Sequence, residues 1–332
     1  MLPTNQNIQL SFDEGLTQSE IMERCNCPRK HMFRYILQLK KQGSFSWALL
    51  TGGAVHKLLE LHYKLLQRTG KGLEEPKAIE FDFEPDVILS PEDHETCHYW
   101  QLVAGMLVYR HNIYYEEIDK KLDILNVEVP IDIEYRGFKL RGMIDLVAES
   151  PGKVKPWITD HKTTADLNDI RMEGWQYRFQ FLFYAWMWTK MTGQRPSGTM
   201  TNLIKKPQER RSTKRGESVE DFCRRIDYNI MANPSEFFKR EWIPLDDAML
   251  ERFERYTLDP VLTQFQMLQE ATDENGRFNQ QEKEALLLTP NTDHCTYWNV
   301  KCEFMDLCKN NFEDYAMEFI KKHTKHPELN RN

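Results

Sequence analysis

The sequence lacks the features that would direct it into or across a membrane. None of its apolar runs is long enough to span a bilayer, and its first 15 residues, MLPTNQNIQLSFDEG, are polar, so they do not form an apolar signal segment. It also lacks low-complexity tracts, internal repeats and any cofactor-binding fingerprint. We therefore expect a cytoplasmic protein with no membrane partner, in which the cysteines are free thiols.

An excess of positive charge is also absent. The 332 residues include 44 Lys and Arg against 51 Asp and Glu, a net charge of -7, whereas DNA binding is usually driven by basic side chains that displace counterions. Basic residues are nevertheless concentrated in two stretches. The candidate phosphate contacts are Arg29, Lys30 and Arg34, which alternate with aromatic residues, and Lys205, Lys206, Arg210 and Arg211. A solvated charged loop is the alternative interpretation of the second stretch.

The stretch GMIDLVAESPGKVKPWITDHKTT reads as two β-strands joined by a Ser-Pro-Gly turn. Asp145 lies in the first strand, and Asp160 and Lys162 lie in the second. Because alternate side chains of a strand share a face, Asp160 and Lys162 should point the same way and His161 the opposite way. Two carboxylates suit Mg²⁺ or Mn²⁺, and a nearby ammonium suits the developing charge of phosphodiester hydrolysis. Charged residues placed beside a turn for solubility are the alternative.

Further motifs occur in an order that resembles the RecB-like branch of the PD-(D/E)XK nuclease superfamily. Gly53 and His56 resemble its helical G-x-x-H motif, Glu128 its upstream acidic residue, and Gln180 and Tyr184 its Q-x-x-x-Y motif. A core histidine and ordinary helix packing are the alternative interpretations of these residues. The resemblance implies catalytic roles for Asp145, Asp160, Lys162, Glu128, Gln180 and Tyr184, and metal ligation by His56, Asp145, Asp160 and the backbone carbonyl of His161.

Three of the seven cysteines form a C-x6-C-x5-C group near the C-terminus, and a Cys-Pro pair lies near the N-terminus. This arrangement resembles AddB-type and CRISPR-associated RecB-like exonucleases, which implies a [4Fe-4S] cluster held by Cys27, Cys295, Cys302 and Cys308. Cys25 is the alternative fourth ligand. A structural Zn²⁺ held by the same thiolates, or ordinary buried cysteines without a metal, are alternative interpretations.

The fold expected from these observations is α/β (α+β), with a restriction-endonuclease-like core whose central mixed sheet is flanked by helices. Apolar spacing predicts helices over residues 45–67, 91–120 and 168–192, three strands within 122–162, and a strand over 198–205. We expect a single nuclease domain over residues 1–332. Its parts are a helical part (15–121), the catalytic sheet (122–210) and a second helical part (211–322), and the thiolate metal centre joins the two helical parts.

The resemblance implies a divalent-metal-dependent deoxyribonuclease, an exonuclease that acts on DNA ends during recombination, repair, or phage or CRISPR DNA processing. Its partners would be DNA and a helicase or recombination protein, in the cytoplasm of a bacterial or phage-infected cell. Two alternatives remain: a nuclease-fold subunit that binds DNA or a helicase without cutting, and a thiolate metalloprotein with redox chemistry. The intact Asp-Asp-Lys set favours the enzyme.

Overall fold

The structure is a computed structural model that describes residues 12, 14–152, 155–167, 178–272, 287–309, 315–322, 325–326 and 329. The chain forms two compact units. Unit 1 comprises Met1–Ser44, Pro130–Gly142 and Ala248–Asn332, and unit 2 comprises Phe45–Val129 and Met143–Asp247. The long strands β3 (Asp123–Tyr135) and β4 (Phe138–Glu149) contribute one part to each unit, so the expectation of a single domain over residues 1–332 stays a prediction.

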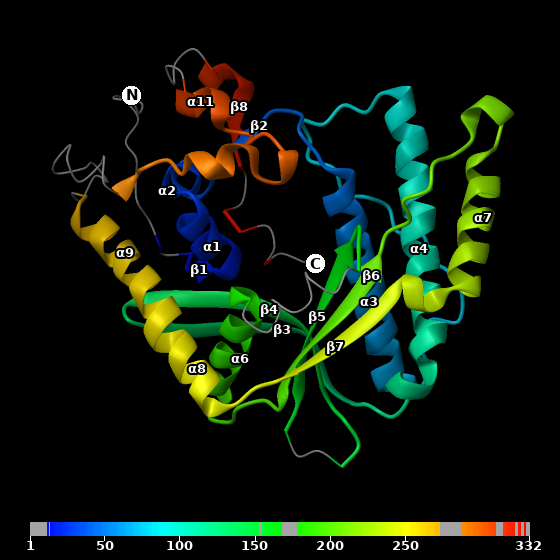
Figure 1. Cartoon of the computed structure of the whole chain (residues 1–332), viewed down its shortest axis with the longest axis horizontal. Coiled ribbons are helices and arrows are strands. Elements are labelled where there is room, and N and C mark those ends of the chain that lie inside the picture. The colour runs from blue at the N-terminus through cyan, green and yellow to red at the C-terminus, as the bar shows by residue number, and fades with distance from the viewer. Residues whose placement is uncertain are drawn as a thin grey trace. The chain divides into compact units, whose positions relative to one another are not determined.

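Unit 2 is built on a mixed sheet. The second part of β4 pairs antiparallel with β5 (Trp157–Thr164), β5 pairs parallel with β6 (Gly198–Lys205), and β6 pairs antiparallel with β7 (Phe238–Pro244). β6 is buried along almost its whole length, as expected of a central strand covered on both faces. These strands lie side by side in Figure 1, and the expected mixed sheet is confirmed.

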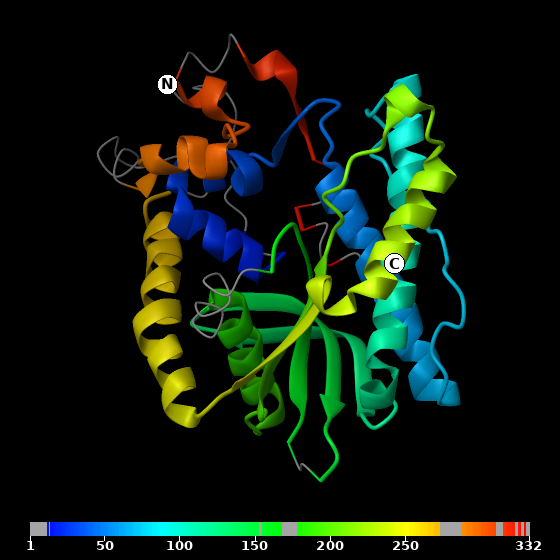
Figure 2. The ribbon, with the colours of Figure 1, turned by 45° about the vertical axis from the view of Figure 1, so that its right-hand side comes forward.

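Helices cover both faces of this sheet (Figures 1 and 2). On one face α3 (Trp47–Thr69) packs against α4 (Pro91–Asp119), which in turn packs against α7 (Val219–Ala232); on the other face α6 (Phe179–Thr192) contacts β5 and β6. The core between the first three helices and the sheet includes the fully buried side chains of Leu58, Tyr63, Val103, Leu107 and Ile226.

Local sequence explains where these helices begin and end. Ser90 accepts a hydrogen bond from the Asp93 backbone N–H and Asp93 accepts one from the Ser90 backbone N–H, a capping box that starts α4 with Pro91 in its first turn. Gly70 and Gly193 take the left-handed conformation that ends α3 and α6. The expected helices over 45–67 and 91–120 and the expected strands are confirmed. The expected helix over 168–192 is confirmed from residue 179 onward, since residues 168–177 lie outside the described part.

Unit 1 combines short helices with short strand pairings. Its first elements are β1 (Leu16–Thr17), α1 (Gln18–Asn26), α2 (Pro28–His31), the π-helix η1 (Met32–Ile36) and β2 (Leu39–Lys41). Its later elements are α8 (Asp247–Phe253), the π-helix η5 (Glu254–Leu258), α9 (Asp259–Glu270), the 3-10 helix η6 (Thr292–Asn299), α11 (Met305–Lys309), the 3-10 turn η7 (Ala316–Glu318) and β8 (Phe319–Lys321). β1 lies parallel to the first part of β4, and β2 pairs antiparallel with β8.

The 3-10 segments η3 (Thr213–Arg215) and η4 (Pro234–Glu236) belong to unit 2. Among the residues that the structure describes, every helix is too short or too polar to cross a membrane.

Candidate active site

Pairing of β4 with β5 brings the two candidate carboxylates together. Leu146 lies opposite Thr159, so the preceding Asp145 and the following Asp160 are cross-strand neighbours. Their side chains are only 4% and 5% exposed. The backbone N–H of His161 donates a hydrogen bond to Asp145 Oδ2 over 2.8 Å, which fixes that carboxylate against β5.

Two further predicted residues contact Asp160. The Lys162 ammonium lies 3.0 Å from both of its carboxylate oxygens, and Gln180 Nε2 donates to Oδ1 over 2.8 Å. Lys162 therefore shares a face of β5 with Asp160, as strand alternation predicts. Gln180 lies in the first turn of α6, and Tyr184 lies one turn further along the same helix, half-buried. The first residue of the Q-x-x-x-Y motif thus reaches the site directly.

His56 reaches the site from α3. Its Nδ1 atom lies 3.4 Å from Asp145 Oδ2, and the side chain is mostly buried. Close approach of α3 to β5 depends on Gly52, because a β-carbon there would lie 3.2 Å from Thr163 Oγ1. A β-carbon at Gly53, the glycine of the G-x-x-H motif, would meet nothing within 4 Å. Packing therefore explains why residue 52 is a glycine, but it does not explain Gly53.

The electrostatics of the site are dominated by two buried carboxylates. Burial raises the pKa of Asp160, the charge of Asp145 raises it further, and Lys162 only partly opposes this rise. A divalent cation between the two carboxylates would offset both the desolvation and the repulsion, so the donor set of two carboxylates and one imidazole fits such an ion. In the described part of the chain, no group of three or more His, Cys, Asp or Glu side chains is already arranged to hold a metal ion.

His161 faces away from the carboxylates, as predicted, and enters a buried polar network. Its ring stacks on Tyr63 of α3 with 5.5 Å between centroids, and its Nδ1 accepts a hydrogen bond from Asn202 Nδ2 over 2.9 Å. Burial holds the pKa of His161 well below its ordinary value, so the ring is neutral. Its backbone carbonyl stays a predicted metal ligand.

The network continues through residues that sequence reasoning missed. Asn202 Oδ1 lies 2.8 Å from His111 Nε2 and 3.3 Å from Arg240 Nε, and Arg240 forms a buried ion pair with Asp119. Of these residues, Asn202 alone could have been recognised from the sequence. It lies in the uncharged strand segment GTMTNLI, and a buried asparagine side chain there must be hydrogen-bonded.

Glu128 lies in β3 with a backbone φ of 53°, in the left-handed region that a non-glycine residue rarely adopts within a strand. Such a conformation costs about 1–3 kcal/mol and is concentrated at functional sites. Its catalytic role, like that of Tyr184, stays a prediction.

The four predicted cluster cysteines lie together within unit 1. Cys27, Cys295, Cys302 and Cys308 line one cavity of about 20 Å³. The Asn291 backbone N–H donates to Cys27 Sγ over 3.4 Å, and the Cys302 N–H donates to the Cys295 carbonyl over 2.8 Å. Burial raises the pKa of Cys302 and of Cys308, so both thiols stay protonated unless a metal binds them. Cys25 is exposed and does not line this cavity.

The candidate phosphate contacts of unit 1 also have partners within the protein. Arg34 pairs with Glu23 and Glu303, Lys30 lies 2.9 Å from a Glu23 carboxylate oxygen, and Arg29 Nε donates to a backbone carbonyl over 2.8 Å. These side chains therefore contribute to the packing of unit 1, and their binding of DNA stays a prediction.

The basic stretch of unit 2 is similar. Arg211 lies 2.7 Å from a carboxylate oxygen of Glu95, Lys205 lies over the Phe237 ring, and burial lowers the pKa of Lys206. Arg210 is exposed. Contacts of these four residues with DNA stay a prediction.

Comparison with known proteins gives a family. Residues 15–309 match the model of the PD-(D/E)XK nuclease superfamily. No curated protein matches the chain. Among solved structures, a "Putative exonuclease" from Eubacterium rectale shares 14% identity over 94% of both chains with a TM-score of 0.40. The crystal structure of SSO0001 shares 12% identity over 88% of this chain and 95% of that one, with a TM-score of 0.28.

The family match covers most of the chain, including all the residues that contact Asp145 and Asp160, and the mixed sheet flanked by helices agrees with it. The chain therefore belongs to the PD-(D/E)XK nuclease superfamily.

Proposed function

We propose that the protein is a divalent-metal-dependent deoxyribonuclease of the RecB-like type that hydrolyses phosphodiester bonds at DNA ends. The observation that carries this proposal is the buried group of Asp145, Asp160 and Lys162, to which α6 adds Gln180 and α3 adds His56. A nuclease-fold subunit that only binds DNA would have no use for two buried carboxylates with an ammonium beside them, because they reduce stability unless they hold a cation.

His56, Asp145, Asp160 and the His161 carbonyl would hold Mg²⁺ or Mn²⁺, which supplies binding of a phosphate oxygen and a lowered pKa for a bound water. The protein's own groups orient the reactants. Lys162, held 3.0 Å from Asp160, stabilises the negative charge that develops on the phosphate. Gln180 and the His161 N–H fix the two carboxylates by hydrogen bonds and so keep their lone pairs directed into the site.

Cleavage of end-labelled linear DNA and of circular DNA, each single- and double-stranded, tests the proposal. We expect Lys162→Met to lower the cleavage rate by at least about 10²-fold, as expected when a group that stabilises transition-state charge is lost. Lys64→Met is the matched control, because Lys64 lies on α3 in a surface pair with Glu60. Equal rates in Lys162→Met and wild type would refute the assignment, and cutting of circular DNA would refute the exonuclease.

The metal itself provides a second measurement. Because His56 adds a nitrogen donor to oxygen donors, we expect Mn²⁺ to support cleavage at least as well as Mg²⁺. The preference for Mn²⁺ should disappear in His56→Ala. Unchanged metal preference in that variant would remove His56 from the ligand set.

We further propose that the four cavity cysteines bind a [4Fe-4S] cluster, with a single Zn²⁺ as the alternative. Four thiols in one small cavity support a shared metal centre, and burial raises the pKa of the Cys302 and Cys308 thiols, which makes these two poor thiolates without a metal. A cluster that joins Cys27 to the Cys295–Cys308 region closes a very long loop, so its loss should lower stability strongly.

Metal analysis and visible absorbance of anaerobically purified protein distinguish the two centres. We expect Cys302→Ser to lose the metal and lower the melting temperature, while Cys25→Ser, which changes an exposed neighbour of Cys27, keeps both. Metal-free wild-type protein with the melting temperature of Cys302→Ser would eliminate both centres.

A further inference from the structure

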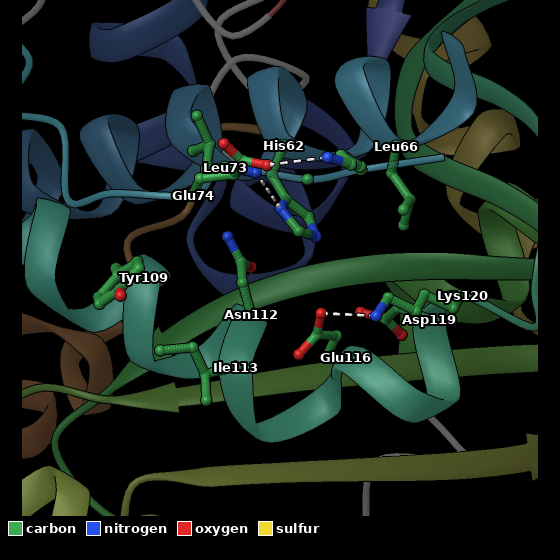
Figure 3. A pocket seen from close by; sticks show the side chains of 12 residues that line it. His62, Leu66, Leu73, Glu74, Tyr109, Asn112, Ile113, Glu116, Asp119 and Lys120 are labelled. Carbon is green, nitrogen blue, oxygen red and sulfur yellow. Dashed lines mark hydrogen bonds and ion pairs between the residues drawn. The ribbon is translucent and has the colours of Figure 1, made fainter. Parts of the chain in front are cut away.

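Unit 2 contains a cavity of about 330 Å³ whose lining includes none of the predicted active-site residues. It is bounded by α3, by the segment of residues 71–74 and by α4 (Figure 3). Figure 3 shows the His62 ring of α3 and the Asn112 amide of α4 pointing toward each other across it. Both side chains are 5% exposed, and each has a nitrogen without a hydrogen-bond partner among the described residues, His62 Nε2 and Asn112 Nδ2.

The protonation of His62 follows from its one hydrogen bond. The Leu73 backbone N–H donates to His62 Nδ1 over 3.1 Å, so Nδ1 acts as an acceptor. Burial lowers the pKa of His62 to about 4, so the ring is neutral near pH 7 and its single proton resides on Nε2. A β-carbon at Gly72 would lie 2.0 Å from His62 Cε1, so the segment holds the ring in place. The wall of the cavity therefore contains one buried hydrogen-bond donor that has no partner among the described residues.

The orientation of Asn112 follows from the buried network. Asn202 Oδ1 accepts from Arg240 Nε, so His111 Nε2, at 2.8 Å from the same oxygen, must donate to it. Burial lowers the pKa of His111 to about 4, so its other nitrogen, Nδ1, is an acceptor and needs a donor from Asn112, 3.2 Å away. A half-turn of the Asn112 amide supplies that donor and leaves its carbonyl oxygen directed into the cavity.

The cavity thus offers a donor and an acceptor on a lining that also contains the apolar side chains of Leu66, Leu73 and Ile113. Each charged side chain of the lining has a partner of opposite charge, since Lys120 lies 2.7 Å from Glu116, Lys71 lies 3.7 Å from Glu74, and Asp119 pairs with Arg240 outside the lining. A space of this volume is about ten times the share of one water molecule and lies within the range of small-molecule sites.

We propose that this cavity binds a nucleobase through an edge that carries a hydrogen-bond acceptor next to a donor. The acceptor receives the proton of His62 Nε2, and the donor meets the Asn112 carbonyl oxygen. The Watson–Crick edge of each of the four DNA bases has an acceptor next to a donor. The lining has three carboxylates and two ammonium groups, all of them paired, which argues against recognition of a phosphate and in favour of the base itself. The choice of a base among planar amide-like ligands rests on the chain's membership in a nuclease superfamily, whose products are nucleotides.

The test is calorimetric titration of the full-length protein in EDTA, where hydrolysis plays no part. The probes are deoxyadenosine and deoxycytidine, with deoxyribose 5-phosphate as the base-free control. We expect both nucleosides to bind and the sugar phosphate not to bind. Asn112→Leu, which removes one hydrogen bond, should weaken binding about tenfold.

A second variant avoids the buried network. Ile113 lines the cavity and is 47% exposed, so Ile113→Trp should fill the cavity without disturbing the core and should abolish binding. Ile118→Trp is the matched control, because Ile118 is 49% exposed on the same helix and does not line the cavity. No binding by folded wild type, or equal binding by Ile113→Trp and wild type, would overturn the proposal.

A short single-stranded oligonucleotide in EDTA identifies the source of the base. If it competes with deoxyadenosine and loses affinity in Ile113→Trp, the cavity receives a base at a strand end, and if only the nucleoside binds, the cavity receives free product; either result supports a base site. Lys162→Met should keep nucleoside binding, so failure of the proposed nuclease activity would leave this result unaffected.

Discussion

Arg240 of β7 supports a stability prediction that can be worked out from its contacts. Its guanidinium is almost fully buried and donates to both oxygens of Asp119, to the Tyr63 hydroxyl over 2.9 Å and to Asn202 Oδ1 over 3.3 Å. It also lies 3.7 Å from the centroid of the Tyr115 ring. One side chain therefore joins β7 to α3, α4 and β6.

Replacement of Arg240 by Met should be costly because it leaves the Asp119 carboxylate buried without its cation. Burial alone raises the pKa of Asp119, but the hydrogen bonds and charge of Arg240 hold it below its ordinary value. Breaking a buried pair in this way typically costs about 3–5 kcal/mol, a large part of the roughly 5–15 kcal/mol that stabilises a domain. Arg240→Lys keeps the positive charge but not the bidentate contact with Asp119. Its loss of unfolding free energy should therefore lie between zero and that of Arg240→Met.

Urea unfolding at pH 7, followed by circular dichroism, measures these differences. The double variant Arg240→Met with Asp119→Leu should lose much less than the sum of the two single variants, because the second change removes the uncompensated charge that the first creates. A loss below about 1 kcal/mol in Arg240→Met, or strict additivity in the double variant, would refute the reasoning.

Asp160→Asn should abolish cleavage yet raise the melting temperature of EDTA-treated protein at pH 7, because a carboxyl with a raised folded-state pKa destabilises the fold once it ionises; the exposed Asp132→Asn is the control, and a lower melting temperature in Asp160→Asn would contradict the electrostatic picture. His62 and His111 have folded-state pKa values near 4, below the ordinary 6.5, so the unfolded chain binds more protons between these values. The free energy of unfolding, measured by urea titration, should therefore fall as the pH is lowered from about 6.5 to about 4, by up to about 1.4 kcal/mol per pH unit for each histidine, and a pH-independent value would show that these rings are not buried neutral. Gly53→Ala should raise the unfolding free energy by about 0.5–1 kcal/mol, because the helix gains a better helix former in open space. If Gly53 gives room to DNA, the same variant should lose cleavage activity, and unchanged cleavage would leave the motif glycine without a role.

Local chemistry explains why much of the fold could be predicted. The helix that starts at Pro91 and the helix that ends at Gly193 were recognisable because cap residues and apolar spacing act over a few residues. The pairing of β2 with β8 could not be predicted, since Leu39 and Lys321 are partners across most of the chain and both strands are only three residues long. Such pairing depends on tertiary packing, not on propensity.

Part of the candidate site could likewise be predicted from the sequence, and part could not. Strand alternation and the turn at Pro151 sufficed to bring Asp145 near Asp160 and Lys162, because these features set the register of two adjacent strands. The buried network around Asn202 and Arg240 was missed, because it depends on how β6 and β7 align with each other and with two helices. The roles of such residues become clear only when the side chains packed around them are known.

The alternation of side chains along β5 has a consequence for how this site can evolve. Asp160 and Lys162 lie on the face of the candidate active site, while the intervening His161 points to the other face, where it stacks on Tyr63 of α3 and is hydrogen-bonded by Asn202 of the neighbouring strand β6. A shift of β5 by one residue would turn Asp160 toward α3 and His161 toward the active site, so the register of this strand is fixed. We therefore expect changes of substrate specificity to arise in the surrounding loops and added helices, while the position of β5 stays the same.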